Sequence, residues 1–295
     1  MVEKVKSGVV IIGATGLLGQ PLAAQSSQLF DTIALTHKDL DITETDRVYE
    51  KICSLKPKVI VLTAAYSDVD GCEINPGRAR AVNVHGVKNV ARAAGDIGAA
   101  LISLSTDHVF DGKSNRPYKE EDPTGPVNVY GQTKWEGERV VQTSLTKYII
   151  VRTTWLFGGG NKGFVPYVLS SIRQKKPMSV IADKVASPTY TVDLSTAICD
   201  LVRFVLNGRY DFKKYSIVHI VNTGTCSWFD IARFVLDELN IRDLELSPAA
   251  LDVFLFKAKR PRYSALDNSL FAEITGKQMR NWQTALKEFI LCQRI

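Results

Sequence analysis

Two side chains that could carry proton chemistry lie one helical turn apart in the segment Tyr130-Gly131-Gln132-Thr133-Lys134. Residues four positions apart on a helix share a face, so the phenol of Tyr130 and the ammonium group of Lys134 would lie side by side. A tyrosine phenol ordinarily has a pKa of about 10, and acid–base work near neutrality takes roughly 4 kcal/mol of extra stabilisation of the phenolate. Because a nearby ammonium group favours the phenolate, the pair predicts a general acid–base site.

A hydroxyl that could orient a substrate precedes this pair. Thr106 lies 24 residues before Tyr130, directly after an apolar run at residues 100–104. Open α/β sheets bind ligands at the carboxyl ends of their strands, where a hydroxyl can hydrogen-bond a substrate carbonyl. A threonine at this place can also simply cap the next turn. The joint occurrence of Thr106, Tyr130 and Lys134 in this order favours the catalytic interpretation.

A glycine-rich turn lies near the N-terminus. The residues Gly13-Ala14-Thr15-Gly16-Leu17-Leu18-Gly19 follow an apolar run at 9–12 and open a helical stretch. Glycines let the backbone approach a pyrophosphate, and the helix N-terminus presents free N–H groups to it. Glycines also end strands for steric reasons alone, but the position between a strand and a helix predicts a dinucleotide site.

The choice between the two nicotinamide cofactors depends on the end of the second expected strand, at residues 32–35. An NAD-specific site would carry an acid there for the ribose hydroxyls. This chain has Thr36-His37-Lys38 instead, and acids follow only at Asp39 and Asp41. Lys38 could neutralise the 2′-phosphate of NADPH, although it could equally be an ordinary surface lysine. NADPH is therefore favoured, with NADH as the alternative.

The first half of the chain alternates strands and helices that would position these residues. Short β-branched runs predict strands at 9–12, 32–35, 59–62, 100–104 and 148–151, and helical stretches fall at 17–29, 44–55, 78–97 and 130–142. Alternation of this kind predicts an α/β fold, with a Rossmann-type doubly wound parallel sheet.

The second half lacks this regular alternation of strands and helices. It has a glycine loop near residue 158, and helices are expected over 192–206 and from Ser227, where Asp230 completes a capping box. We expect residues 1–155 to form the dinucleotide-binding domain. Residues 156–295 would form mainly a smaller α/β substrate-binding lobe, interleaved with the end of the sheet.

Composition excludes several classes of protein. Apolar residues make up 45% and charged residues 23% of the 295 positions, as in ordinary globular chains. The net charge of +6 is spread along the chain without a nucleic-acid-binding motif, and no apolar run approaches the roughly 18–20 residues of a membrane span. The N-terminus lacks a secretory pattern, so we expect a cytoplasmic protein that binds neither nucleic acid nor membrane. Five scattered cysteines predict free thiols and no metal site.

Further segments are distinctive along nearly the whole chain. They are residues 64–70 (AAYSDVD), 83–86 (NVHG), 105–112 (STDHVFDG), 126–131 (PVNVYG), 152–155 (RTTW), 187–194 (SPTYTVDL) and 260–267 (RPRYSALD). Together with the glycine turn and the Thr–Tyr–Lys set, they resemble the dTDP-4-dehydrorhamnose reductase family, which belongs to the extended short-chain dehydrogenases.

The resemblance implies reduction of the C4 ketone of a nucleotide-activated 6-deoxy-hexulose. Tyr130 would donate the proton, Thr106 would orient the carbonyl, and Lys134 would assist Tyr130 and hold the nicotinamide ribose. The expected cofactor contacts are Gly13, Thr15, Gly16, Leu17, Leu18, Gly19, Lys38, Asp41, Ile42, Ala64, Ala65, Tyr66, Tyr130 and Lys134. The expected substrate contacts are His108, Trp155 and Arg262, with a plain core position for Trp155 and a surface ion pair for Arg262 as the alternatives.

One residue departs from the family pattern. Relatives commonly have tyrosine after Thr-Asp, whereas this chain has His108, which leaves the identity of the sugar open. Related sugar-nucleotide dehydratases carry a glutamate there as the base for elimination, so His108 favours net reduction. Alternatives are a reductase of a different nucleotide sugar and a non-catalytic dinucleotide-binding protein resembling the regulatory subunit of methionine adenosyltransferase. The oligomeric state is open, with a homodimer as one alternative.

Overall fold

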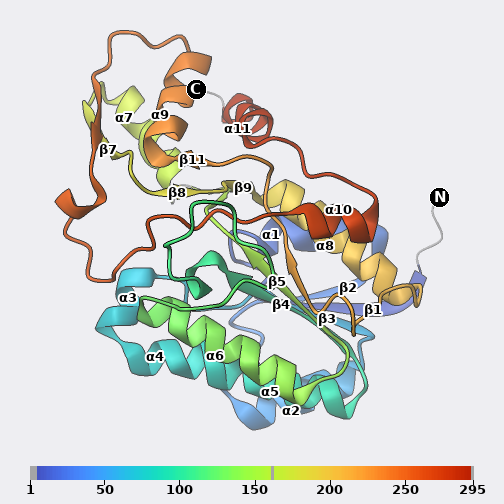
Figure 1. The fold of residues 1–295 in the computed structure, drawn as a ribbon. Coiled ribbons are helices and arrows are strands. Elements are labelled where there is room, and N and C mark those ends of the chain that lie inside the picture. The colour runs from blue at the N-terminus through green and yellow to red at the C-terminus, as the bar shows by residue number, and fades with distance from the viewer. Residues whose placement is uncertain (1–4, 161–162, 294–295) are drawn as a thin grey trace.

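Short runs of valine, isoleucine and leucine form the central sheet, because strands covered on both faces need apolar side chains on both. The computed structural model describes residues 5–160 and 163–293. The strands of this sheet are β1 (Val5–Ile12), β2 (Phe30–Leu35), β3 (Val59–Leu62), β4 (Ala100–Thr106), β5 (Tyr148–Thr153) and β10 (Ile217–His219). They pair in parallel in the order β10-β5-β4-β3-β1-β2, so the predicted doubly wound sheet is confirmed (Figure 1).

Helices cover both faces of the sheet. One face packs against α1 (Gly19–Leu29) and α8 (Thr191–Leu206), and the other against α2 (Thr45–Leu55), α5 (Val87–Asp96) and α6 (Val129–Ser144). Figure 1 shows these layers, with α2, α5 and α6 below the sheet and α8 above it. The helices expected from the sequence therefore lie on the correct stretches of chain.

The stretch expected as one helix over residues 78–97 is interrupted. It consists of α4 (Pro76–Arg80), a π-helical turn (Ala81–Gly86) and α5, and it follows the short helix α3 (Val69–Ile74). The π turn carries the buried Asn83, whose side chain accepts a bond from the Tyr66 amide (2.9 Å) and donates to the Tyr66 carbonyl (3.0 Å) and the Thr133 hydroxyl (3.2 Å). The irregular turn thus ties the loop after β3 to helix α6. Periodicity alone could not reveal it.

The second half of the chain forms a smaller layer beyond the sheet. Helices α7 (Phe164–Arg173), α9 (Trp228–Glu238) and α11 (Trp282–Leu291) enclose an apolar core beside the pair β7 (Met178–Ile181) and β12 (Leu246–Ala249). The predicted capping box at the start of α9 is confirmed, because Ser227 and Asp230 bond reciprocally.

This half also returns to the sheet, since it supplies α8 and β10. Short pairs join β6 (Leu156–Phe157) to β9 (Thr189–Tyr190) and β8 (Val185–Ala186) to β11 (Cys226–Ser227), and α10 (Ser269–Thr275) packs beside β10. The proposed boundary at residue 155 stays a prediction.

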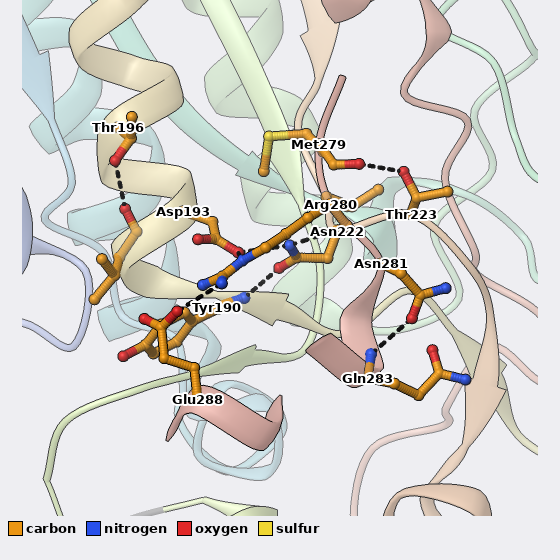
Figure 2. Close-up of polar contacts among 12 residues, drawn as sticks. Tyr190, Asp193, Thr196, Asn222, Thr223, Met279, Arg280, Asn281, Gln283 and Glu288 are labelled. Atoms are coloured by element: carbon orange, nitrogen blue, oxygen red, sulfur yellow. Dashed lines mark hydrogen bonds and ion pairs between the residues drawn. The ribbon is translucent and has the colours of Figure 1, made fainter. Parts of the chain in front are cut away.

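A polar cluster fastens α8 to the C-terminal segment (Figure 2). Asp193, in the first turn of α8, accepts bonds from Asn222 (2.7 Å) and from Arg280 (2.8 Å). Arg280 also pairs with Glu288 of α11 at 2.6 Å, and Asn222 accepts from the Tyr190 amide at 2.7 Å. One guanidinium group thereby links α8 to α11, which holds the smaller layer against the sheet.

None of the helices in residues 5–160 and 163–293 has the length and apolar character that crossing a bilayer requires. The five cysteines are free thiols.

Candidate active site

A cleft of about 630 Å³ runs along the carboxyl ends of the sheet strands. The turn after β1, the ends of β2, β3 and β4, the first turns of α6 and the segment after β5 all line it. These are the places where a doubly wound sheet presents loops to a ligand.

The glycine turn after β1 forms one wall, and its glycines are sterically required. Gly13 has φ +100°, and a Cβ there would lie 2.6 Å from the Ala64 nitrogen. A Cβ at Gly19 would overlap the Gly13 carbonyl oxygen. Helix α1 begins at Gly19 without a side-chain cap, and the Gln20 amide is already bonded to the Gly16 carbonyl (3.1 Å). The amides of residues 17–19, which have no backbone acceptor among the described residues, are therefore the ones available to an anionic ligand. The turn therefore fits a dinucleotide pyrophosphate.

Helix α6 starts against the end of β4. Asn128 caps it by accepting a hydrogen bond from the Gly131 amide at 2.7 Å. A Cβ at Gly131 would overlap the carbonyl oxygen of His108, so only glycine lets the helix approach this closely. This contact brings Tyr130, in the first turn of α6, next to Thr106 at the end of β4.

Tyr130, Thr106 and Lys134 all line the cleft. Burial raises the pKa of Tyr130 well above its ordinary value, and a hydrogen bond with Thr106 partly opposes this effect. Burial lowers the pKa of Lys134 to about 8, while the charge of Glu138 opposes the shift. Tyr130 is thus a protonated phenol at neutral pH, ready to give a proton to an acceptor in the cleft.

The Lys134 ammonium is held in place by the backbone. It donates to the Leu104 carbonyl at 2.6 Å. Behind it, Glu138 accepts bonds from Ser105 (2.5 Å) and from the Arg152 guanidinium (2.7 and 2.9 Å), and this ion pair is almost fully buried. The buried pair joins α6 to β4 and β5, and so fixes the helix face that carries Tyr130 and Lys134.

The protonation state of His108 follows from its partners. The Asn128 side-chain oxygen is taken by the Gly131 amide, so its nitrogen must be the atom 2.9 Å from His108 Nδ1. Because an amide NH₂ only donates, Nδ1 accepts and the ring proton lies on Nε2. Burial lowers the pKa of His108 to about 4, which keeps the ring neutral at pH 7. His108 lines the cleft, with its ring 5.4 Å from that of Tyr130.

Trp155 adopts a strained backbone. Its φ is +43°, in the left-handed region that non-glycine residues rarely adopt. The strained backbone turns the chain directly after β5, where the partly buried indole lines the cleft and lies 5.5 Å from the ring of Trp228. Trp155 thus lines the cleft and also packs against the apolar core of the smaller layer, and its contact with the substrate stays a prediction.

Comparison with known proteins identifies the family. Residues 7–294 match the family described as RmlD substrate binding domain. A dTDP-4-dehydrorhamnose reductase of Aggregatibacter actinomycetemcomitans is 37% identical over 286 residues, which cover 95% of this chain and 97% of the relative. The chain belongs to the dTDP-4-dehydrorhamnose reductase family. The resemblance stated from the sequence is thereby confirmed.

Two further relatives of this reductase family are informative. The Bacillus subtilis spore coat polysaccharide biosynthesis protein SpsK is 33% identical, with 96% of each chain covered. The crystal structure of a Bacillus anthracis dTDP-4-dehydrorhamnose reductase in complex with NADP superposes with a TM-score of 0.90 at 34% identity, covering 98% of this chain and 100% of that one.

The cleft brings together most of the residues that the sequence suggested for this reductase fold. The cleft residues from that set are Gly13, Thr15, Gly16, Leu17, Leu18, Gly19, Asp41, Ile42, Ala64, Ala65, Tyr66, Thr106, His108, Tyr130, Lys134 and Trp155. Lys38 is not among the lining residues, whereas the preceding His37 is. A role for Lys38 in cofactor choice therefore stays a prediction without support from its position.

Arg262 also lies outside the cleft. It lines a separate cavity of about 450 Å³ together with Phe254 and Phe256, and its half-exposed side chain pairs with Asp183 and Asp252. This is the surface ion pair that the sequence left as the alternative reading. Substrate binding by Arg262 stays a prediction.

Sequence reasoning missed several residues of the site. Arg78 lines the cleft and lies over the Tyr66 ring at 4.9 Å. Asp107 lines it too, with one carboxylate oxygen bonded to Thr106 and the other without a partner among the described residues. The Lys184 ammonium lies 4.7 Å from the centre of the Trp155 ring. Arg78 lies in α4 and Lys184 in the turn between β7 and β8, and neither belongs to a distinctive local motif, so the sequence alone carried no signal for them.

Proposed function

We propose that the protein is an NADPH-dependent reductase that converts the C4 ketone of a dTDP-linked 6-deoxy-hexulose into an alcohol. The observation that carries this proposal is the meeting of Thr106, Tyr130 and Lys134 in one cleft beside the glycine turn. Membership of a family whose relatives are named dTDP-4-dehydrorhamnose reductases supports it.

The cofactor proposal follows from the fit of the cleft. NADPH supplies the hydride when it is bound. The glycine turn and the first turn of α1 would hold its pyrophosphate, and Asp41 and Ile42 would line its adenine site. A relative of 34% identity is in complex with NADP, which favours NADPH over NADH. His37 is the basic side chain of the cleft closest to the end of β2 and would face the 2′-phosphate.

The protein side of the reaction is proton delivery and orientation. Thr106, whose hydroxyl donates to Asp107 in this structure, would turn that proton to the ketone oxygen when the sugar binds, and Tyr130 would give its proton to that oxygen as negative charge develops there. Lys134 would stabilise the resulting phenolate by its charge. Neutral His108, with its proton on Nε2, would donate to a sugar oxygen nearby, and Trp155 would cover the sugar ring.

The test is consumption of NADPH by the purified protein with dTDP-4-keto-6-deoxyhexose as the acceptor, with NADH run in parallel. The proposal expects rapid consumption of NADPH and slower consumption of NADH. Tight binding of NADPH without turnover of this sugar would contradict it and would favour the regulatory alternative or another nucleotide sugar.

Three finer expectations stay predictions. They are a cytoplasmic location, a homodimer, and a boundary at residue 155 between the dinucleotide-binding part and the substrate-binding lobe. Size-exclusion chromatography with light scattering measures the second directly.

A further inference from the structure

Lys184 is a buried cation packed against Trp155, a residue that lines the cleft. It lies in the turn between β7 and β8, is 2% exposed, and places its ammonium 4.7 Å from the centre of the Trp155 ring. Burying a lysine is costly unless the charge has a use or a partner. The carboxylate next to it in the chain, Asp183, pairs with Arg262, so it does not neutralise Lys184.

The backbone on both sides of Lys184 is fixed. On one side the Asp183 carboxylate accepts a bond from the Leu251 amide (2.6 Å); on the other the Val185 amide donates to the Arg262 carbonyl (2.7 Å), and the Ser264 amide donates to the Val185 carbonyl (2.8 Å). These bonds leave the turn little freedom, so the conformation of the turn directs the Lys184 side chain into the protein. Its ammonium faces the Trp155 indole, which itself lines the cleft.

Asp107 provides the complementary group. Its side chain is 2% exposed, and Oδ1 accepts a bond from Thr106 at 3.0 Å. Oδ2 has no hydrogen-bond partner within residues 5–160 and 163–293, although a buried carboxylate oxygen normally has one. Burial lowers the pKa of Lys184 to about 8; the charge of Asp107 opposes this shift, and that of Arg260, which is paired with Asp70, adds to it. Asp107 thus acts on Lys184 by its charge, although Oδ2 forms no hydrogen bond with the ammonium.

We propose that Lys184 is a specificity-determining residue of the sugar pocket: with Asp107 it binds one hydroxyl of the sugar, the ammonium donating to its oxygen and Oδ2 accepting its proton. This inference rests on the proposed function and adds to it the substrate group that is recognised. A hydroxyl is the group that fits, because it can accept and donate at the same time.

The chemistry also selects which hydroxyl. Asp107 is the immediate neighbour of Thr106, which is assigned to the C4 ketone. On a 6-deoxy-hexulose the two carbons next to C4 are C3, which carries a hydroxyl, and C5, which carries a ring oxygen and a methyl group. The hydroxyl on C3 is therefore the one within reach of a group beside Thr106. A site that hydrogen-bonds a hydroxyl rejects an analogue without it, since its buried polar groups are then left unpaired.

The experiment compares two substrates, dTDP-4-keto-6-deoxyhexose and the analogue that lacks only the C3 hydroxyl, on wild type and on Lys184→Met. Methionine keeps an apolar stem against Trp155 and removes only the ammonium. We expect the wild type to prefer the hydroxylated sugar in kcat/KM by roughly 10- to 100-fold, as for loss of a bond to a charged group. Lys184→Met should lose most of this preference through a raised KM for the hydroxylated sugar, with KM for NADPH unchanged.

Controls separate this role from a structural one. Lys213→Met, at an exposed lysine far from the cleft, should keep the wild-type preference. Asp107→Asn presents an NH₂ group where Oδ2 lay, and it should lose the preference for the hydroxylated sugar as Lys184→Met does. If Lys184→Met fails to fold, Asp107→Asn tests the inference alone. A preference retained by both variants overturns the inference, as does a wild type that reduces both sugars equally well. A wild type that reduces neither sugar overturns the proposed function itself.

Discussion

Gly131 of α6 and His108 at the end of β4 are in direct backbone contact, so close that a Cβ at residue 131 would overlap the His108 carbonyl oxygen. The same two segments are joined again through Asn128, which caps α6 and holds the His108 ring. Tyr130 and Thr106, the proposed proton donor and substrate-orienting hydroxyl, are thus positioned by one close contact between a helix and a strand end.

Gly131→Ala should therefore lower activity although every side chain assigned to the reaction is unchanged. The added methyl group pushes α6 away from β4, and we expect turnover to fall by about 100-fold, since small misplacements of reacting groups are this costly. Gly159→Ala is the matched control, because open space surrounds Gly159. Steady-state kinetics on both variants tests the contact, and wild-type turnover in Gly131→Ala would rule it out.

Tyr130→Phe removes only the hydroxyl that is assigned to proton donation. We expect kcat to fall by about 10²–10⁴-fold, the usual contribution of a positioned general acid. NADPH binding and the melting temperature should stay near the wild-type values, because the ring remains. Steady-state kinetics measures the fall in kcat, and fluorescence titration with NADPH measures cofactor binding. Full activity in this variant would refute the assignment.

Stability should rise with pH between about pH 4.5 and 6.5. Burial lowers the pKa of His108 from 6.5 to about 4 and that of His219 to about 3. Below pH 6.5 the unfolded chain therefore protonates these histidines while the folded protein does not, and the free energy of unfolding falls as the pH falls toward these values. Burial raises the pKa of Glu120 from 4.5 to about 7, and its contribution is lost as the pH rises through that range. Because the two histidines outweigh Glu120 by one proton, the free energy of unfolding should rise by about 1.4 kcal/mol per pH unit in this range.

Urea unfolding at several pH values measures this slope. His219→Asn removes one titrating group and should flatten the dependence, since only His108 then opposes Glu120. A slope that is the same in the variant and the wild type would show that His219 is not the group concerned.

Arg152→Met should destabilise the protein strongly. The Arg152–Glu138 pair is almost fully buried, and removing the cation leaves an uncompensated carboxylate, at a cost of about 3–5 kcal/mol. Arg242→Met is the control, because its pair with Asp237 is exposed and should contribute less than about 1 kcal/mol. Chemical denaturation of both variants makes the comparison; equal losses would mean that burial of the pair is unimportant.

The sequence revealed the sheet and most of the cleft because their signals are local. Buried strands are apolar runs, and the glycine turn and the Tyr–Lys pair lie within a few residues of chain. Lys184 and the unpartnered oxygen of Asp107 became visible only in three dimensions, since the turn that carries Lys184 is held by hydrogen bonds to Leu251, Arg262 and Ser264, which are distant in the sequence. The π turn at Asn83 was missed for a related reason, because the bonds that stabilise it reach Tyr66 and Thr133, distant in the sequence.

In the proposed reaction, C4 of the sugar receives a hydride from NADPH in this cleft. A single turnover with NADPH that carries deuterium on the transferable position, followed by NMR of the sugar product, measures this transfer directly. We expect deuterium on C4 of the product from the wild type and almost none from Tyr130→Phe in the same time. A product without deuterium at C4, or no product although NADPH is bound, would contradict it.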